Sequence, residues 1–165
     1  MTAVARSAPD LRELADEQAG RVTPLAADVT TDAFGAELRR AAEQAPLTGA
    51  LVYASAMPPG TLAELVRPVV AGPVVLLVTS EWAAPSHTNT DSEAWLPNVL
   101  SAAASSGAVS RLLVLGWHGH GRGHGHTARW HTPQEISAAA LALLDAPADQ
   151  DAVLGRVRPW ASRPK

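Results

Sequence analysis

At 165 residues, the chain has the length of one domain, with little room for a second. Its hydrophobic content of 47% and charged content of 18% allow a buried core and exclude an intrinsically disordered protein. The formal net charge of −3 argues against a nucleic-acid partner, and the absence of cysteine excludes disulfides, thiolate metal sites and cysteine nucleophiles. The sequence shows no signal-peptide pattern and no apolar run of roughly 20 residues, so we expect a cytoplasmic protein without a membrane partner.

Two kinds of apolar pattern alternate along the chain. Apolar residues at helical spacing predict helices, and continuous β-branched runs predict strands that are buried on both faces. In chain order, the prediction is a helix from Leu11, a strand over 21–26, a helix from Phe34, a strand over 49–54, a helix from Thr61, strands over 73–79 and 111–115, a helix over 132–144 and a strand over 153–157. Thr132 and Glu135 form a capping-box pattern at the start of the last helix, with Pro133 at its first position. The alternation predicts an α/β fold with a parallel sheet.

Glycine alternates with histidine in one internal segment, residues 116–127, which reads GWHGHGRGHGHT. In an extended chain, residues i and i+2 point to the same side, so neighbouring imidazoles can bind one ion. Without cysteine, such ligands suit a divalent metal such as Zn, Cu, Ni or Fe. Two other interpretations stay open: a solvated loop with only weak metal affinity, and histidines that act in acid–base catalysis without a metal. Five of the six histidines lie in this segment or just after it: His118, His120, His124, His126 and His131.

A serine and a glutamate follow the neighbouring predicted strand. Ser80 and Glu81 come directly after the strand over 73–79, and the histidine segment follows the strand over 111–115. Ligands of open parallel sheets bind beyond the carboxyl ends of the strands. Glu81 with two histidines would give a two-histidine, one-carboxylate metal set, although Ser80 also fits a strand-end serine that only satisfies backbone groups. The candidate catalytic residues are therefore His118, His120, Ser80 and Glu81.

Five segments carry a resemblance to a known family. They are 11–29 (LRELADEQAGRVTPLAADV), 49–56 (GALVYASA), 72–84 (GPVVLLVTSEWAA), 109–116 (VSRLLVLG) and 132–157 (TPQEISAAALALLDAPADQDAVLGRV). These segments resemble the helices and strands of the short-chain dehydrogenase/reductase (SDR) family from its second helix to its last strand. The resemblance implies a Rossmann-like fold in which Ser80 stands at the catalytic serine. If a dinucleotide binds, the resemblance places Asp28 and Ala54 at its site.

The chain also departs from that family. The family's first β-α-β unit has no counterpart here, and neither does its Gly-x-x-x-Gly-x-Gly loop for the pyrophosphate. The catalytic Tyr-x-x-x-Lys is replaced around Trp95, and Lys165 is the only lysine in the chain, so we do not expect NAD(P) chemistry. The fold predicted is thus a three-layer Rossmann-like parallel sheet of about five strands that lacks the first β-α-β unit. The strand over 21–26 should then pair directly with the strand over 49–54, because an open edge would invite a second copy or another chain.

These observations predict an enzyme that keeps the pocket of the family but has lost its reductase machinery. A histidine or a metal would assist an isomerisation, cyclisation or dehydration of a small carbonyl compound. The arginine- and alanine-rich composition fits the specialised metabolism of a high-GC bacterium. Two alternatives stay open: a non-catalytic subunit paired with a complete reductase or another biosynthetic enzyme, and a residual NAD(P)-dependent oxidoreductase.

Overall fold

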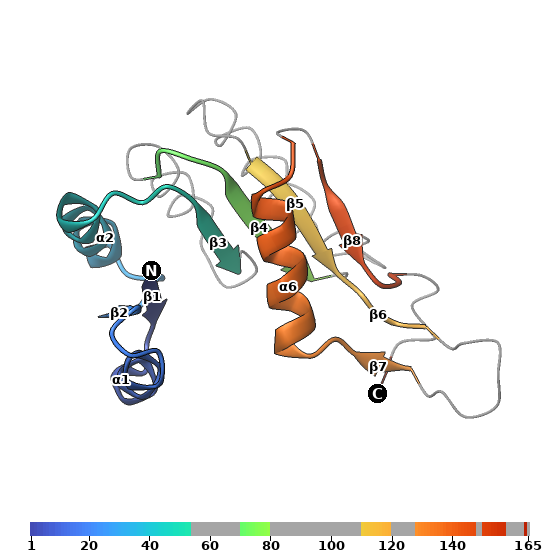
Figure 1. Ribbon diagram of the computed structural model, residues 1–165, viewed down its shortest axis with the longest axis horizontal. Coiled ribbons are helices and arrows are strands. Elements are labelled where there is room, and N and C mark those ends of the chain that lie inside the picture. Colours follow the sequence, from blue (N-terminus) through green and yellow to red (C-terminus); the bar gives the residue numbers. More distant parts are fainter. Residues whose placement is uncertain (54–69, 80–109, 120–127, 148–149, 158–163, 165) are drawn as a thin grey trace.

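The computed structural model describes residues 1–53, 70–79, 110–119, 128–147, 150–157 and 164. Within these residues, the largest sheet has four parallel strands in the order β3-β4-β5-β8 (Figure 1). The predicted mixed α/β fold with a parallel sheet is confirmed, whereas the helix predicted from Thr61 lies outside the described residues. The strands of this sheet are β3 (Ala50–Tyr53), β4 (Val74–Thr79), β5 (Ser110–Leu115) and β8 (Ala152–Leu154).

The core is built around β4, in which every residue from Val74 to Val78 is buried. Successive side chains of a strand point to opposite faces of the sheet, so β4 contributes to two apolar clusters. Val75 and Leu77 pack with Ala140 and Leu143 of α6 (Pro133–Leu144), while the alternate residues of β4 share a cluster with α2 (Ala33–Gln44). The continuous apolar sequence of β4 follows from burial on both faces.

Helix α6 is held at both of its ends. At its start, the Thr132 side chain accepts a hydrogen bond from the backbone N–H of Glu135, and the Glu135 carboxylate accepts one from the backbone N–H of Thr132. The predicted capping box is therefore confirmed. At its end, the buried side chain of Arg111 donates to the backbone carbonyls of Leu144, Ala146 and Pro147. Since Arg111 lies in β5, it joins the sheet to the end of the helix.

An N-terminal unit consists of β1 (Thr2–Ala5), α1 (Ala8–Glu17) and β2 (Thr23–Ala26). Figure 1 shows it on the β3 side of the four-stranded sheet. The predicted helix from Leu11 and the predicted strand over 21–26 are present as α1 and β2, whereas β1 was not predicted from the sequence. The prediction that the strand over 21–26 pairs directly with β3 was wrong, because β2 pairs in parallel with β1 instead. The short α1 connection brings these two strands together as one β-α-β unit.

An apolar cavity of about 400 Å³ lies between β1 and β3. Its walls include Val4 of β1, Phe34 and Leu38 of α2, and the four residues of β3. In the described part of the chain, β1 is hydrogen-bonded only to β2, and β3 only to β4. The edges of β1 and β3 that face away from these neighbours are therefore open there.

Two short strands form a ribbon beyond the end of β5. Trp117–His118 (β6) pairs antiparallel with Arg129–Trp130 (β7). The backbone of Trp117 also exchanges two hydrogen bonds with Arg156, so the residues after β8 bend along the ribbon. This explains why β8 ends at Leu154, earlier than the predicted strand over 153–157. In the described part of the chain, no helix has both the length and the apolar character needed to cross a membrane.

Candidate metal centre

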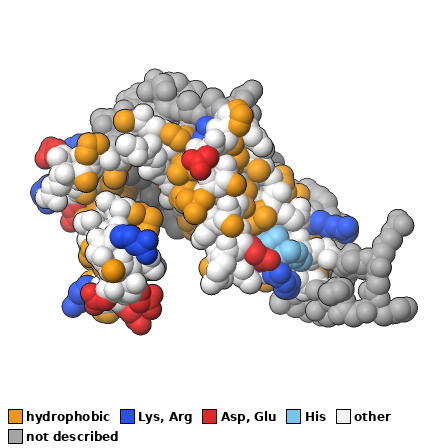
Figure 2. All heavy atoms as spheres, in the orientation of Figure 1, with side chains coloured by type: hydrophobic (Ala, Val, Ile, Leu, Met, Phe, Trp, Pro, Cys, Tyr) orange, Lys and Arg blue, Asp and Glu red, His pale blue; other side chains and the backbone are white. Residues whose placement is uncertain are grey.

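Three side chains that can ligate a metal meet where α6 begins. They come from His118 on β6, His131 just before the N-cap of α6, and Glu135 in the first turn of that helix. One ligand atom from each residue can be chosen so that all three atoms lie within 4.8 Å of one another. In the space-filling view of Figure 2, histidine side chains lie beside a carboxylate and a cationic group on this part of the surface.

Strand register and helix start together position the cluster. In the β6–β7 ribbon, His118 lies directly opposite Arg129, so both side chains can reach the same neighbour. That neighbour is Glu135: its Oε1 lies 3.1 Å from Nε2 of His118 and accepts a hydrogen bond of 2.8 Å from Nη2 of Arg129. Trp117 and Trp130 pack edge to face, with ring centroids 6.1 Å apart, and so stabilise the adjacent pair of the ribbon.

His131 is the most informative residue of the cluster. Its side chain is only 4% exposed, and neither ring nitrogen has a hydrogen-bond partner in the described part of the chain. Oε2 of Glu135 lies 3.6 Å from Nδ1 of His131. Burial lowers the pKa of His131 and the neighbouring His118 lowers it further, and together they outweigh the opposite effects of Glu135 and of the Leu154 backbone, so the ring is neutral near pH 7. A neutral imidazole is the form that binds a metal ion.

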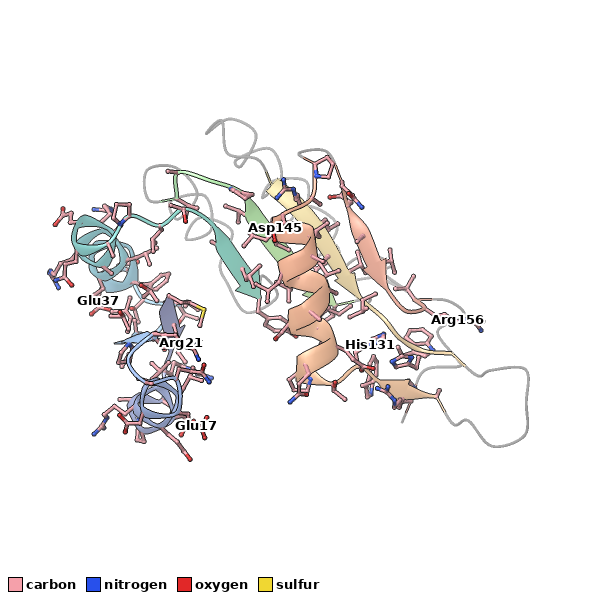
Figure 3. The ribbon with its side chains drawn as sticks, in the orientation of Figure 1. Glu17, Arg21, Glu37, His131, Asp145 and Arg156 are labelled. Atoms are coloured by element: carbon pink, nitrogen blue, oxygen red, sulfur yellow. The ribbon has the colours of Figure 1, made fainter. Side chains whose placement is uncertain are left out.

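His118 and His131 lie close enough to act on one ligand. Their ring centroids are 4.2 Å apart and their planes are tilted by 46°. Figure 3 shows His131 at the start of α6, on the side of the helix where Arg156 lies. Gly155 allows this placement, because a Cβ atom there would lie 2.4 Å from Nε2 of His131. Gly155 also has a φ of +81°, which favours glycine.

Glu135 is held rigidly and in its charged form. Its Oε2 accepts hydrogen bonds from the backbone N–H of Thr132 and from Nη1 of Arg129, at 2.8 and 2.9 Å. The hydrogen bonds from Arg129 contribute most to lowering the pKa of this carboxyl far below its usual value, followed by the bond from Thr132. The N-terminus of a helix favours a negative charge as well. A carboxylate is therefore available at this point throughout the neutral pH range.

The ligand set and its spacing fit a small divalent ion. In a tetrahedral zinc site with bonds of about 2.1 Å, two ligand atoms lie about 3.4 Å apart. Nε2 of His118 lies 3.1 Å from Oε1 of Glu135, and Nδ1 of His131 lies 3.6 Å from Oε2, the other oxygen of the same carboxylate, so each separation is near that value although they do not share one oxygen. Two imidazoles and one carboxylate are the ligands of catalytic rather than structural zinc sites, since they leave a coordination position free. The cluster could therefore hold a metal ion.

The structure brings together only part of the residue set predicted from the sequence. His118 and His131 belong to the cluster. Asp28 lies elsewhere, at the turn before α2, where its carboxylate accepts hydrogen bonds from the backbone and hydroxyl of Thr30. These bonds lower the pKa of Asp28, and they are a local turn contact. The remaining predicted residues lie outside the described part of the chain: Ala54, Ser80, Glu81, His120, His124 and His126.

The carboxylate of the cluster was not predicted from the sequence. Glu135 was interpreted only as the last residue of a capping box, and Glu81 was proposed as the metal-binding acid. The spacing of His131 and Glu135 was the available signal, since residues i and i+4 lie near one another at a helix start. Arg129 was not singled out either, because its pairing with Glu135 depends on the β6–β7 ribbon.

Comparisons with known proteins assign no family. No protein-family model matches the chain, and neither the curated proteins nor the solved structures gave a match. The interpretation of function therefore depends on the geometry of the cluster.

Proposed function

We propose that this protein binds a divalent metal ion, zinc in the first instance, through His118, His131 and Glu135, and uses it in a non-redox reaction of a small carbonyl compound. The observation that carries the proposal is the buried His131 ring, which lies beside a second imidazole and a charged carboxylate and whose nitrogens lack a hydrogen bond of normal geometry among the described residues. Leaving both nitrogens of a buried imidazole without a partner costs free energy. A metal bond would remove the part of that cost that comes from one of the two nitrogens.

The surroundings of the cluster support a catalytic rather than a purely structural role. A metal at this position would act as a Lewis acid on a carbonyl oxygen or would lower the pKa of a bound water. The side chain of His118 is 42% exposed, so this part of the cluster is accessible to a small molecule. A water bound to that metal would supply a proton transfer at neutral pH. Isomerisation, dehydration and cyclisation of carbonyl compounds all need such a proton transfer.

The position of the cluster fits a Rossmann-like arrangement, which we propose as the finer description of the fold. The cluster lies just beyond the carboxyl end of β5, at the N-terminus of a helix that packs on the parallel sheet. Ligands of open parallel sheets bind at this edge. A divergent, truncated relationship to short-chain dehydrogenases/reductases stays a proposal based on the sequence resemblance alone.

Metal analysis of tag-free protein tests the binding step. We expect about one zinc per chain in the wild type. His131→Ala and Glu135→Gln should each bind zinc more than about tenfold more weakly, because even outer-shell changes weaken metal sites by that factor. Thr132→Ala is the matched control, because it removes the cap hydroxyl but keeps the Glu135 carboxylate. Full zinc affinity in His131→Ala would show that the ion is held elsewhere, and the proposed centre would then be wrong.

A proton-exchange assay tests the chemical step. The zinc-loaded protein is incubated in heavy water with a panel of small ketones and hydroxyketones, and deuterium uptake next to the carbonyl is followed by NMR. We expect uptake above the rate of free zinc for at least one compound, with loss of that uptake in His131→Ala. A protein that binds zinc but never exceeds the rate of free zinc would contradict the enzymatic proposal.

A second candidate function is favoured by a different observation. The open edges of β1 and β3 on either side of the apolar cavity would accept an extended segment of another chain, which suits a non-catalytic subunit of a complex. Light scattering of the purified protein, alone and mixed with reductases of the same genome, tests this role. A chain that stays monomeric in every mixture would count against it.

A further inference from the structure

The apolar cavity between β1 and β3 is bounded on one side by backbone groups of β1 that no described strand uses. Successive residues of a strand direct their backbone N–H and C=O groups to alternate edges of the strand. The carbonyl of Ala5 accepts a hydrogen bond from the backbone N–H of Ala27, at the β2 edge. The alternate residues Thr2 and Val4 therefore direct their backbone groups away from β2 and toward the cavity that they line.

The opposite wall of the cavity has the same property. The backbone N–H of Ala50 donates to the carbonyl of Pro73, so Ala50 and Val52 direct their backbone groups toward β4. The alternate residues, Leu51 and Tyr53, direct theirs toward the cavity that they line. Within the described ranges, neither β1 nor β3 has a hydrogen-bonded neighbour on this side. Two rows of donors and acceptors thus face one space, and an extended chain placed between them would pair with both.

Helix α2 holds β1 and β3 in one layer on either side of this space. Its buried Phe34 shares an apolar cluster with Val4 of β1 and Val52 of β3. In parallel strands, residues on the same face direct their backbone groups to the same side. Val4 directs its groups toward β3, and Val52 directs its groups toward β4, so β1 and β3 run in the same direction. A single strand between them would continue the parallel pairing on both sides.

The side chains around the space favour an apolar segment that is followed by an acid. Leu51 and Tyr53 are large but remain 43% and 51% exposed, and exposed apolar patches mark interaction sites. Arg6 follows β1 directly, is exposed and lines the cavity. A strand parallel to β1 would end beside Arg6, where a carboxylate would complement the guanidinium.

We propose that the space between β1 and β3 receives one extended segment of a partner protein, which runs parallel to both strands, presents apolar side chains to α2 and ends in an acidic residue. This inference rests on the second candidate function and names the chemistry of its partner, and it does not depend on the metal centre. Main-chain hydrogen bonds would supply the affinity of such an added strand, and side chains at alternate positions its specificity. The segment should contain no proline, since both of its edges are paired.

Amide exchange of the full-length protein, followed by NMR, tests the pairing. The probe is the capped peptide acetyl-Thr-Val-Thr-Val-Thr-Glu-amide. The backbone amides of Val4, Leu51 and Tyr53 should exchange rapidly in the free protein, and the peptide at saturation should slow them by about tenfold or more. A peptide with proline in place of the second valine should bind about tenfold more weakly, because it lacks one N–H. Amides that are already protected in the free protein would show that the chain itself fills the space, and the proposal would be wrong.

Two variants of one residue separate strand pairing from side-chain contact. Leu51→Pro removes an N–H that faces the cavity but keeps the bonds between β3 and β4, and proline is tolerated at such edge positions. Leu51→Ala is the matched control, because it shortens the side chain and keeps the N–H. We expect Leu51→Pro to bind the peptide about tenfold more weakly than Leu51→Ala. Equal affinities would mean that no backbone pairing occurs, which would overturn the proposal. If Leu51→Pro does not fold, the wild type is tested with peptides N-methylated at each valine in turn, and full affinity for all of them would overturn it equally.

The position of the charge tests the direction of the segment. The probe should bind about threefold more tightly than the same peptide with its glutamate moved to the amino end, and Arg6→Gln should abolish this preference. Arg12→Gln, an exposed arginine of α1, is the matched control and should keep the preference. A wild type without the preference, or an Arg6→Gln variant that keeps it, would overturn the parallel direction and the role of Arg6.

The outcomes also separate this inference from the second candidate function. If a reductase associates with the protein in light scattering but the peptide does not bind, the partner docks elsewhere: the strand insertion is wrong and the complex stands. If the peptide binds but no reductase associates, the insertion is supported and a reductase is the wrong partner. A dimer of the protein alone that the peptide dissociates would show that a second copy fills the space, and the assignment to a different protein would be wrong.

Discussion

Replacing Arg111 tests the contact that joins the sheet to the end of α6. The Arg111 side chain is 6% exposed and donates to three backbone carbonyls, those of Leu144, Ala146 and Pro147. These carbonyls belong to the last turn of the helix and the residues after it, where no intrahelical donor is available. Arg111→Met keeps most of the side-chain volume but leaves the carbonyls without this donor.

The size of the expected loss of stability depends on how well water can reach these carbonyls once the arginine is removed. Pro147 is an exposed residue, so water can replace the lost hydrogen bond there, whereas Leu144 and Ala146 are partly buried. A hydrogen bond to a charged donor contributes about 1.5–3 kcal/mol, and removing the buried guanidinium recovers part of its desolvation cost. We therefore expect Arg111→Met to lower the free energy of unfolding by about 2–4 kcal/mol, a large part of the stability of an ordinary domain.

Urea unfolding, followed by circular dichroism and by tryptophan fluorescence, measures this loss. Arg39→Met, an exposed arginine of α2, is the matched control and should change the free energy of unfolding by less than about 0.5 kcal/mol. A loss below about 1 kcal/mol for Arg111→Met would refute the reasoning, because it would mean that the helix end does not depend on this arginine. Metal affinity gives a second readout: the start of α6 is held separately, so zinc binding under native conditions should change by less than about threefold.

Three further predictions concern the first turn of α6 and its surroundings. Thr132→Ala removes the cap hydroxyl and should lower the free energy of unfolding by about 1 kcal/mol in urea titrations; an unchanged midpoint would show that this cap does not stabilise the helix. Gly155→Ala forces a Cβ against Nε2 of His131 at 2.4 Å, whereas Gly20→Ala has a similar positive φ and nothing within 4 Å. Both variants should lose about 1–2 kcal/mol of stability, because alanine is strained at a positive φ. Gly155→Ala alone should lose more stability than this and also bind zinc more weakly. The folded-state pKa of Glu135 is depressed, so its stabilising contribution is present above the ordinary value of 4.5 and is lost as the pH falls below it. Urea midpoints of the metal-free protein should therefore fall less steeply below pH 4.5 in Glu135→Gln than in the wild type, and parallel curves would contradict the assigned contacts.

Local sequence patterns predicted most of the elements correctly. The apolar run of β4 is buried on both faces, as a continuous β-branched sequence requires. The Thr132-to-Glu135 capping box marks the start of α6 because it depends only on residues within one helical turn. The strand β1, in contrast, has four residues and no pattern of its own, and it forms only by pairing with β2.

The candidate site, too, was predicted only in part from the sequence. The concentration of histidines at the carboxyl end of a predicted strand pointed to His118 and His131, because histidine in number beside a sheet edge favours a ligand site. The partner carboxylate could not be chosen from the sequence. The fold places Glu135 beside the two described histidines, whereas Glu81 lies outside the described residues.

The sequence by itself determined the α/β class, the buried strands and the capped helix, because these depend on neighbouring residues and on side-chain periodicity. Tertiary structure decided the cluster. His118, Arg129 and Glu135 meet because a two-residue ribbon places the first two opposite each other and the start of α6 supplies the third. Tertiary structure also buried His131 against Gly155, which is why a ring that would be solvated in an isolated peptide is left without a hydrogen-bond partner in the described fold.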